Sequence, residues 1–364
     1  MYEQVVQHTI SPNAGRFASA GVVAEGLGKR YDDLWALRDL DLQVPPGTVL
    51  GVLGHNGAGK TTAIRILTTL THASEGRASV AGFDVASQAA QVRQHIGVAA
   101  QQATVDGLMS ARLNLEMVGR LYGLSKAEAR RRGDALLEQL ELTDAASKLV
   151  KTFSGGMRRR LDLAASIMAN PEVLFLDEPT TGLDPRSRGD LWQILRDLVR
   201  EGTTVILTTQ YLEEADRLAD DIVVLDHGRT VAHGTPADLK TRIGDDRIDV
   251  TVAAHGDLVA AAGALSVFAS NDSSFDEDLL IVTAPIAEGT RLIDVVRALD
   301  QAGIDAVDIN RRQATLDEVF LALTSPTAPD RVLHSANHDH ATHDHANHDH
   351  ANHDHANHDH GATV

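Results

Sequence analysis

Gly54-His55-Asn56-Gly57-Ala58-Gly59-Lys60-Thr61 decides the fold, because this stretch fits the phosphate-binding pattern G-x-x-x-x-G-K-[ST]. The apolar run before it, residues 48–53, is short enough for a buried strand, and the run after it, residues 62–70, has helical spacing. A strand, a glycine loop and a helix in this order are the context that the pattern requires. The sequence therefore predicts a nucleotide site within an α/β domain.

The residue types of the loop suit a bound triphosphate. Glycines let the backbone N–H groups surround the β- and γ-phosphates, and the following helix directs its positive end at the same anion. Lys60 is expected to bind β- and γ-phosphate oxygens, and the Thr61 hydroxyl to ligate Mg²⁺. The predicted nucleotide-binding residues of this stretch are Gly54, His55, Asn56, Gly57, Ala58, Gly59, Lys60, Thr61 and Thr62.

Composition limits the classes of function. The 364 residues are 43% hydrophobic, which suggests two domains plus extensions. The chain has no cysteine, so it can form neither a disulfide framework nor a thiolate nucleophile. A net charge of −18 argues against a general nucleic-acid binder. Residues 1–20 lack the pattern of a secretory signal and are expected to form a loose extension.

A phosphate loop also requires a strand that ends in carboxylates, and Val173-Leu174-Phe175-Leu176-Asp177-Glu178 provides one. Asp177 can hold Mg²⁺, directly or through water. Glu178, one residue later, is placed to polarise a water for in-line attack on the γ-phosphate. The two motifs together predict Mg²⁺-dependent ATP hydrolysis.

Two further stretches, Phe153-Ser154-Gly155-Gly156-Met157 and Gly182-Leu183-Asp184-Pro185, indicate the class of ATPase. Here the chain resembles the ATP-binding cassette (ABC) ATPases, over residues 22–235. The first stretch matches their signature motif, with Phe and Met in place of the usual Leu and Gln, and the second matches their D-loop. The resemblance implies an α/β fold with a RecA-like core, an antiparallel β part and a helical insert. It also implies a head-to-tail homodimer, in which Ser154, Gly155, Gly156 and Asp184 of one copy close on the ATP of the other.

The same resemblance assigns three more positions. Tyr31 matches the aromatic residue that stacks on adenine. Gln101 matches the Q-loop glutamine, which contacts Mg²⁺ and water and touches the membrane partner, although Gln102 fits the same position. Gln210 stands where the family usually has its switch histidine. A glutamine can donate a hydrogen bond to a γ-phosphate but cannot take up a proton near neutral pH.

Residues 208–216 and 314–320 narrow the resemblance to the daunorubicin/doxorubicin-resistance type of exporter ATPase. That type implies efflux of a hydrophobic, drug-like substrate. The transport path would be a separate membrane permease of about six spans, each needing roughly 20 apolar residues, and no run in this chain approaches that length. The protein would then lie at the cytoplasmic face of the cell membrane, attached through the permease.

The chain is expected to divide into four parts. They are an extension (1–20), an ABC ATPase domain (21–240) with a helical insert at about 105–165, a small α+β domain (245–325) and a disordered tail (326–364). Capping boxes predict helices that begin at Ser125 and at Thr315. A hairpin is expected to turn at His227-Gly228. Strands at Val22–Ala24 and Leu40–Val44 are expected to flank Tyr31.

The tail leaves alternatives open. Residues 336–360 are five pentapeptides, Ala-Asn-His-Asp-His four times and Ala-Thr-His-Asp-His once. Imidazole beside carboxylate suits Ni²⁺, Zn²⁺ or Cu²⁺, so the tail either binds metal or is a solvated low-complexity segment. The chain could therefore serve a metal-related exporter. A soluble ABC ATPase that acts on ribosomes or DNA fits less well, because the sequence has one phosphate loop and no sustained heptads.

Overall fold

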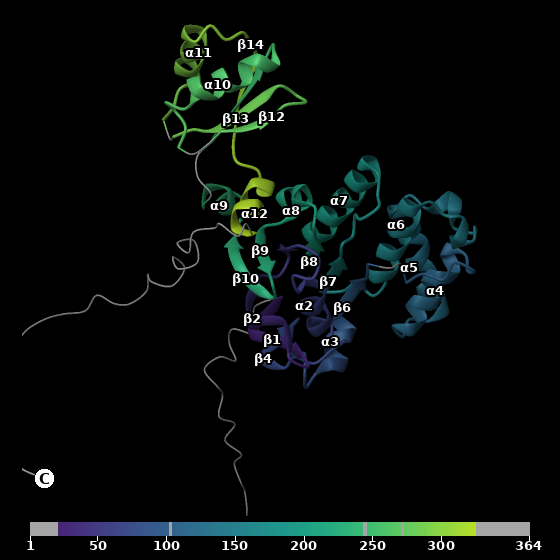
Figure 1. The fold of residues 1–364 in the computed structure, drawn as a ribbon. Helices are drawn as coiled ribbons and strands as arrows, with labels where there is room; N and C mark the ends of the chain where they lie inside the picture. The colour runs from purple at the N-terminus through teal and green to yellow at the C-terminus, as the bar shows by residue number, and fades with distance from the viewer. Residues whose placement is uncertain (1–20, 102–103, 243–245, 271–272, 288, 325–364) are drawn as a thin grey trace, which may run out of the picture. The chain divides into compact units, whose positions relative to one another are not determined.

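The computed structural model describes residues 21–101, 104–242, 246–270, 273–287 and 289–324, in which three β-sheets are covered by helices (Figure 1). In chain order the elements are β1 (Val22–Tyr31), β2 (Leu34–Val44), β3 (Val49–Leu53), α2 (Lys60–Leu67), β4 (Glu75–Val80), β5 (Phe83–Asp84), α3 (Ala89–His95), β6 (Ile96–Ala99), α4 (Ala111–Leu121), α5 (Lys126–Gln139), α6 (Gly155–Ser166), β7 (Val173–Asp177), α7 (Pro185–Arg200), β8 (Thr204–Thr209), α8 (Leu212–Leu218), β9 (Asp221–Asp226), β10 (Arg229–Gly234), α9 (Pro236–Arg242), β11 (Arg247–Val252), α10 (Leu258–Leu265), β12 (Ser274–Asp276), β13 (Ile281–Pro285), α11 (Leu292–Gln301), β14 (Ala306–Arg312) and α12 (Leu316–Thr324).

The central sheet positions the candidate site. Its strand order is β10-β9-β3-β8-β7-β6, and every neighbouring pair is parallel except β9 and β10. All residues of β3, β7 and β8 are buried, as expected for parallel strands that are covered on both faces. Because these three strands are parallel neighbours, their carboxyl ends meet at one edge, where ligands bind in open α/β sheets.

A second, antiparallel sheet has the order β2-β1-β4-β5, and its apolar side packs in one core with α2 and the central sheet. The hairpin of β1 and β2 is much longer than the predicted strands Val22–Ala24 and Leu40–Val44. Tyr31 is the last residue of β1 rather than part of a connection. The register shifts three times between Ala24 and Arg30, so the alternation of apolar residues that marks a strand is broken there.

Helices α4, α5 and α6 form the predicted helical segment and share an apolar core with α7. The capping box at the start of α5 is confirmed, because the Ser125 hydroxyl accepts from Glu128 N–H at 3.3 Å and the Glu128 carboxylate accepts from Ser125 N–H at 3.0 Å. The hairpin at His227-Gly228 is also confirmed, with both residues at positive φ, 45° and 78°. Such a two-residue turn matches the twist of its flanking strands.

Strands β11, β12, β13 and β14 form a third sheet in the order β12-β13-β11-β14, all antiparallel, and it shares one core with α10 and α11. The sequence did not predict β12, whose three residues are all exposed. The last helix, α12, carries the capping box expected at Thr315, and its Leu316 and Val319 are buried with residues of β3, α8 and α9. The predicted domain boundaries remain predictions. Residues 1–20 and 326–364 lie outside the described residues.

Candidate active site

The phosphate loop connects β3 to α2, and its glycines hold conformations that other residues rarely adopt. Gly54 and Gly59 have φ of 155° and 108°. A Cβ on Gly54 would lie 2.5 Å from the Leu225 carbonyl oxygen, and one on Gly59 would lie 2.7 Å from the Ala36 oxygen. Side chains at these positions would therefore force the loop away from β9 and β2. The loop is also fixed by Ala58, whose carbonyl accepts from Gly228 N–H at 3.0 Å.

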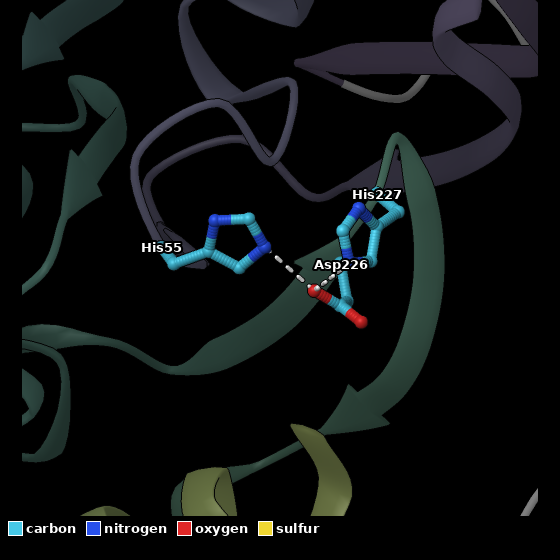
Figure 2. Close-up of side chains that lie close together, drawn as sticks. All are labelled: His55, Asp226 and His227. Atoms are coloured by element: carbon cyan, nitrogen blue, oxygen red, sulfur yellow. Dashed lines mark hydrogen bonds and ion pairs between the residues drawn. The ribbon is translucent and has the colours of Figure 1, made fainter. Parts of the chain in front are cut away.

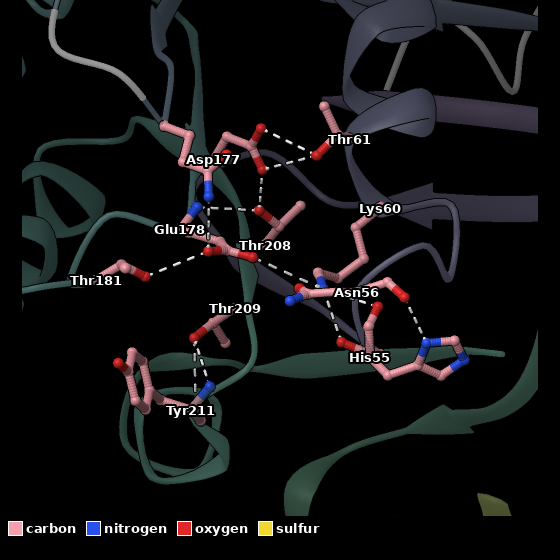
Figure 3. A network of polar contacts seen from close by, with 12 residues as sticks. His55, Asn56, Lys60, Thr61, Asp177, Glu178, Thr181, Thr208, Thr209 and Tyr211 are labelled. Atoms are coloured by element: carbon pink, nitrogen blue, oxygen red, sulfur yellow. Dashed lines mark hydrogen bonds and ion pairs between the residues drawn. The ribbon is translucent and has the colours of Figure 1, made fainter.

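Lys60 opens α2 and points back into the loop (Figure 3). Its Nζ donates to the carbonyl oxygens of Gly54 at 2.7 Å and His55 at 3.2 Å, and lies 3.9 Å from Glu178 Oε1. The side chain is only 5% exposed, and burial lowers the pKa of Lys60, while the negative charges of Glu178 and Asp177 oppose that shift. The ammonium is therefore held among oxygens at the mouth of the loop, where it can exchange carbonyl partners for phosphate oxygens.

The predicted Mg²⁺ ligands lie together. Thr61 Oγ1 is 3.2 Å from one Asp177 oxygen and 3.4 Å from the other, although their positions in the sequence are 116 residues apart. Thr208 on β8 orients the same carboxylate, because its hydroxyl donates to Asp177 Oδ1 at 2.5 Å. The hydroxyl and carboxylate oxygens are the hard donors that Mg²⁺ prefers. These residues therefore fit a magnesium ion on chemical grounds.

Glu178 follows β7 in a left-handed conformation, with φ of 49°. Its N–H is fixed by both the carbonyl and the hydroxyl oxygen of Thr208, each at 3.1 Å. Its Oε2 accepts from Thr181 Oγ1 at 3.3 Å (Figure 3). The same oxygen accepts from Gln101 Nε2 at 3.2 Å. A residue other than glycine rarely holds a positive φ, and such strain gathers at functional sites. In this chain the strained residue is Glu178, whose carboxylate contacts Gln101 and lies 3.9 Å from the Lys60 ammonium.

The remaining predicted site residues are Gln101, Gln210 and Tyr31, of which Gln101 contacts Glu178. Gln101 lies two residues after the end of β6 and reaches Glu178, whereas Gln102 lies outside the described residues. Gln210 directly follows β8, the neighbour of β7, and its side chain is exposed. Tyr31 is 45% exposed, and the Lys29 ammonium lies over its ring, 5.1 Å from the ring centre.

The signature and D-loop residues cap two other helices. The Ser154 hydroxyl accepts from Met157 N–H at 3.2 Å at the start of α6, with Gly155 and Gly156 forming the first turn. Asp184 caps α7, accepting from the N–H groups of Arg186 and Ser187, and these hydrogen bonds, that of Ser187 foremost, lower the pKa of Asp184. Among the hydrogen bonds of the described residues, none joins Ser154 or Asp184 to the phosphate loop.

Sequence reasoning missed Arg159, which ties α6 to the catalytic edge. Its guanidinium donates to the carbonyl oxygens of Ala100 and Pro179, each at 2.7 Å, and of Asp177 at 3.1 Å. It also lies 3.5 Å from the buried Asp162 carboxylate on the same helix. In the sequence Arg159 stands two residues before Leu161, which is fully buried in the structure. No sequence pattern indicated which backbone carbonyl groups the arginine would contact.

Comparison with known proteins agrees with this geometry. A protein-family model described as ABC transporter matches residues 37–181. The daunorubicin resistance ATP-binding protein DrrA3 of Streptomyces coeruleorubidus is 52% identical over 308 residues, which cover 84% of this chain and 96% of that protein. The chain belongs to the ABC transporter ATP-binding proteins. Within this family of ATPases it groups with the daunorubicin/doxorubicin-resistance proteins, since DrrA of Mycobacterium tuberculosis is also 45% identical over 309 residues, covering 84% of this chain and 93% of that protein.

Solved structures show the same ABC fold. An ATP-binding subunit of an ABC transporter superposes with a TM-score of 0.56 at 28% identity, covering 60% of this chain and 91% of that one. The cbiO1 protein of Clostridium perfringens superposes with a TM-score of 0.57 at 25% identity, covering 61% of this chain and 90% of that one. The predicted fold of an ABC ATPase is therefore confirmed.

In the segments that the structure describes, no helix combines the length and the apolar character needed to cross a membrane. The histidine-rich repeats at 336–360 lie outside those segments, so metal binding by the tail remains a prediction.

Proposed function

We propose that this chain is the ATP-hydrolysing subunit of an exporter that moves a hydrophobic, drug-like molecule through a separate membrane permease. One observation carries the enzymatic part of the proposal. The phosphate-loop residues Lys60 and Thr61, the carboxylates Asp177 and Glu178, and Gln101 meet at the edge formed by the ends of β3, β7 and β6. This set contains the groups that phosphoryl transfer to water requires.

Each residue then has a defined role. Lys60 and the N–H groups of the loop bind the phosphates, and Tyr31 stacks on adenine. Thr61 and Asp177 hold Mg²⁺, with Gln101 beside them, and the ion neutralises charge on the phosphates. Glu178 accepts the proton of the attacking water. Gln101 and Thr181 support this role, because both donate to one oxygen of Glu178 and orient the carboxylate.

The exporter works as a head-to-tail homodimer in this proposal. Within one chain the Ser154 hydroxyl accepts a hydrogen bond from Met157 N–H in the first turn of α6, and α6 packs on α4, α5 and β6. The N-terminus of α6 can still bind an anion through its free N–H groups, since a helix start favours negative charge. A second copy would therefore supply Ser154, Gly155, Gly156 and Asp184 to the ATP held by the first.

A mixing experiment tests this arrangement. Lys60→Ala breaks the phosphate loop of one chain, and Ser154→Arg blocks the signature of another. In a head-to-tail heterodimer each ATP site combines the phosphate loop of one copy with the signature motif of the other. Both substitutions then lie in one of the two sites, and the other site is intact. Mixing the two inactive variants should therefore restore ATP hydrolysis above either one alone. Hydrolysis that stays at the level of the separate variants would contradict the arrangement.

The membrane partner and the substrate class rest on the relatives. The protein from Mycobacterium tuberculosis is named a doxorubicin resistance protein, and a relative from Cupriavidus pinatubonensis, 40% identical, is named a Nod factor export protein. Both names describe ATP-binding proteins, which supports a separate permease for this chain and a place at the cytoplasmic face of the membrane. A metal-related exporter is the alternative, and only the histidine-rich tail favours it.

Transport into inverted membrane vesicles tests the export function. Vesicles with this chain and the membrane protein encoded beside it should accumulate doxorubicin when ATP is added, and vesicles with Lys60→Ala should not. Deletion of residues 336–360 should leave this transport unchanged. ATP-independent accumulation, or equal accumulation with Lys60→Ala, would contradict the proposal.

A further inference from the structure

Two histidines and an aspartate gather where the phosphate loop meets the hairpin of β9 and β10 (Figure 2). His55 is the second residue of the loop, Asp226 ends β9, and His227 is the first residue of the turn. Their ligand atoms all lie within 4.8 Å of one another. In the part of the chain that the structure describes, this is the one group of three such side chains. The roles proposed above give His55 a part in nucleotide binding through its backbone N–H and use none of these three side chains.

The hydrogen bonds of His55 fix which ring nitrogen is available. Nδ1 lies 2.7 Å from the carbonyl oxygen of Asn56, which can only accept, so Nδ1 carries the hydrogen. In the neutral ring Nε2 then holds the lone pair, and it faces Asp226 Oδ1 at 2.7 Å. A lone pair on Nε2 and the carboxylate oxygen repel at this distance, so the contact is favourable only with a proton on Nε2 or with a metal ion held by both atoms. A histidine that donates through one nitrogen to a backbone carbonyl while the other faces outward is arranged as metal-binding histidines are.

His227 supplies the third ligand. Its Nε2 lies 4.0 Å from the same Asp226 oxygen, and its ring centre lies 5.3 Å from that of His55. Ligands of a tetrahedral zinc ion lie about 3.4 Å apart, given bonds of roughly 2.1 Å. Binding would therefore move His55 and Asp226 apart from 2.7 Å and bring His227 closer from 4.0 Å, and the His227 side chain, 86% exposed, is free to rotate.

We propose that His55, Asp226 and His227 form a binding site for one first-row divalent transition metal, with Zn²⁺, Ni²⁺ and Cu²⁺ as the fitting ions. Two imidazoles and one carboxylate are the donor set that these ions take, and three protein ligands leave a position for water. The bound ion would join the phosphate loop to the β9–β10 turn, which Gly228 N–H and the Ala58 carbonyl already link.

A second histidine–aspartate pair, in the same hairpin of β9 and β10, provides the control. His233 Nε2 lies 2.6 Å from Asp221 Oδ2, and its side chain is 43% exposed, against 41% for His55. No third ligand of this kind joins His233 among the described residues. If the His55 contact were an ordinary ion pair, with a protonated ring that cannot bind metal, both histidines would respond to a metal in the same way.

Copper-catalysed oxidation of the full-length protein, without nucleotide or Mg²⁺, tests the site. Cu²⁺ with ascorbate and oxygen oxidises the histidines that bind it, and mass spectrometry of peptides measures His55, His227 and His233 separately. Copper bound by residues 336–360 lowers the free Cu²⁺ equally for all three, so their comparison within one sample is unaffected. Cu²⁺ is the probe because it binds such donors most tightly in the first row. His55 and His227 should be oxidised at lower Cu²⁺ concentrations than His233.

Two variants complete the test. Asparagine readily adopts the left-handed backbone conformation of residue 227, so His227→Asn should preserve the turn. This variant should raise the Cu²⁺ concentration for half-oxidation of His55 about tenfold or more, because even residues that only hydrogen-bond to a metal ligand contribute 10–100-fold to metal affinity. His233→Asn should leave that concentration unchanged. Equal oxidation of His55 and His233 would overturn the proposal, and so would oxidation of His55 that is insensitive to His227→Asn.

Discussion

Replacing Arg159 by methionine should destabilise the domain that carries the active site. The substitution keeps an apolar side chain of similar length but removes three hydrogen bonds to the carbonyls of Ala100, Pro179 and Asp177. It also removes the cation beside Asp162, whose side chain is fully buried. Breaking such a buried pair typically costs about 3–5 kcal/mol. Because the backbone N–H and hydroxyl of Thr104 still donate to Asp162, we expect the lower part of that range, about 3 kcal/mol.

Scanning calorimetry of the purified protein measures this loss. A change of about 3 kcal/mol should lower Tm by roughly 6–12 °C for a domain of 150–250 residues. Arg158→Met is the matched control, because Arg158 neighbours Arg159 on α6 and is exposed. It should melt close to the unsubstituted protein. Equal Tm values for the two variants would refute the idea that Arg159 anchors α6 to the carboxyl ends of β6 and β7.

Three further substitutions test individual contacts. Lys60→Ala should weaken ATP binding about tenfold or more in an equilibrium titration, since a hydrogen bond from a charged group contributes about 1.5–3 kcal/mol, and unchanged affinity would count against the phosphate-loop assignment. Gln210→His should raise ATP turnover and add an inflection near pH ~6.5 to the profile of turnover against pH, while Gln210→Ala should lower turnover. Identical pH profiles for these two variants and the unsubstituted protein would show that residue 210 does not reach the γ-phosphate. Thr208→Val should lower the free energy of unfolding by about 2 kcal/mol in urea, because the charge-assisted bond to Asp177 is lost, and an unchanged unfolding midpoint would exclude that bond.

Much of the site could be predicted because its residues follow local patterns. The phosphate loop lies between a buried strand and a helix, and Asp177 ends another buried strand, so each was identified from its own neighbourhood. The capping boxes at Ser125 and Thr315 and the turn at His227 depend on residues within four positions of one another. Such short-range patterns determine local conformation with little help from tertiary packing.

What could not be predicted depends on contacts between distant segments. Arg159 is 59 residues from Ala100, and Asp226 is 171 residues from His55, and no spacing rule links either pair. The hairpin of β1 and β2 was underestimated because bulges interrupt its alternation. Thr208 looked like an ordinary strand residue, since only the pairing of β7 with β8 brings its hydroxyl to Asp177.

The central claim is that Glu178 accepts the proton of the water that attacks ATP. The most direct measurement is the rate of ATP hydrolysis by Glu178→Gln at saturating Mg²⁺-ATP, with nucleotide binding measured on the same preparation. The substitution preserves the bulk of the side chain and removes the base, so hydrolysis should fall about 10²-fold or more while ATP binding is retained. A variant that keeps more than about a tenth of the original turnover would contradict the assignment, since loss of a general base typically costs 10²–10⁴-fold.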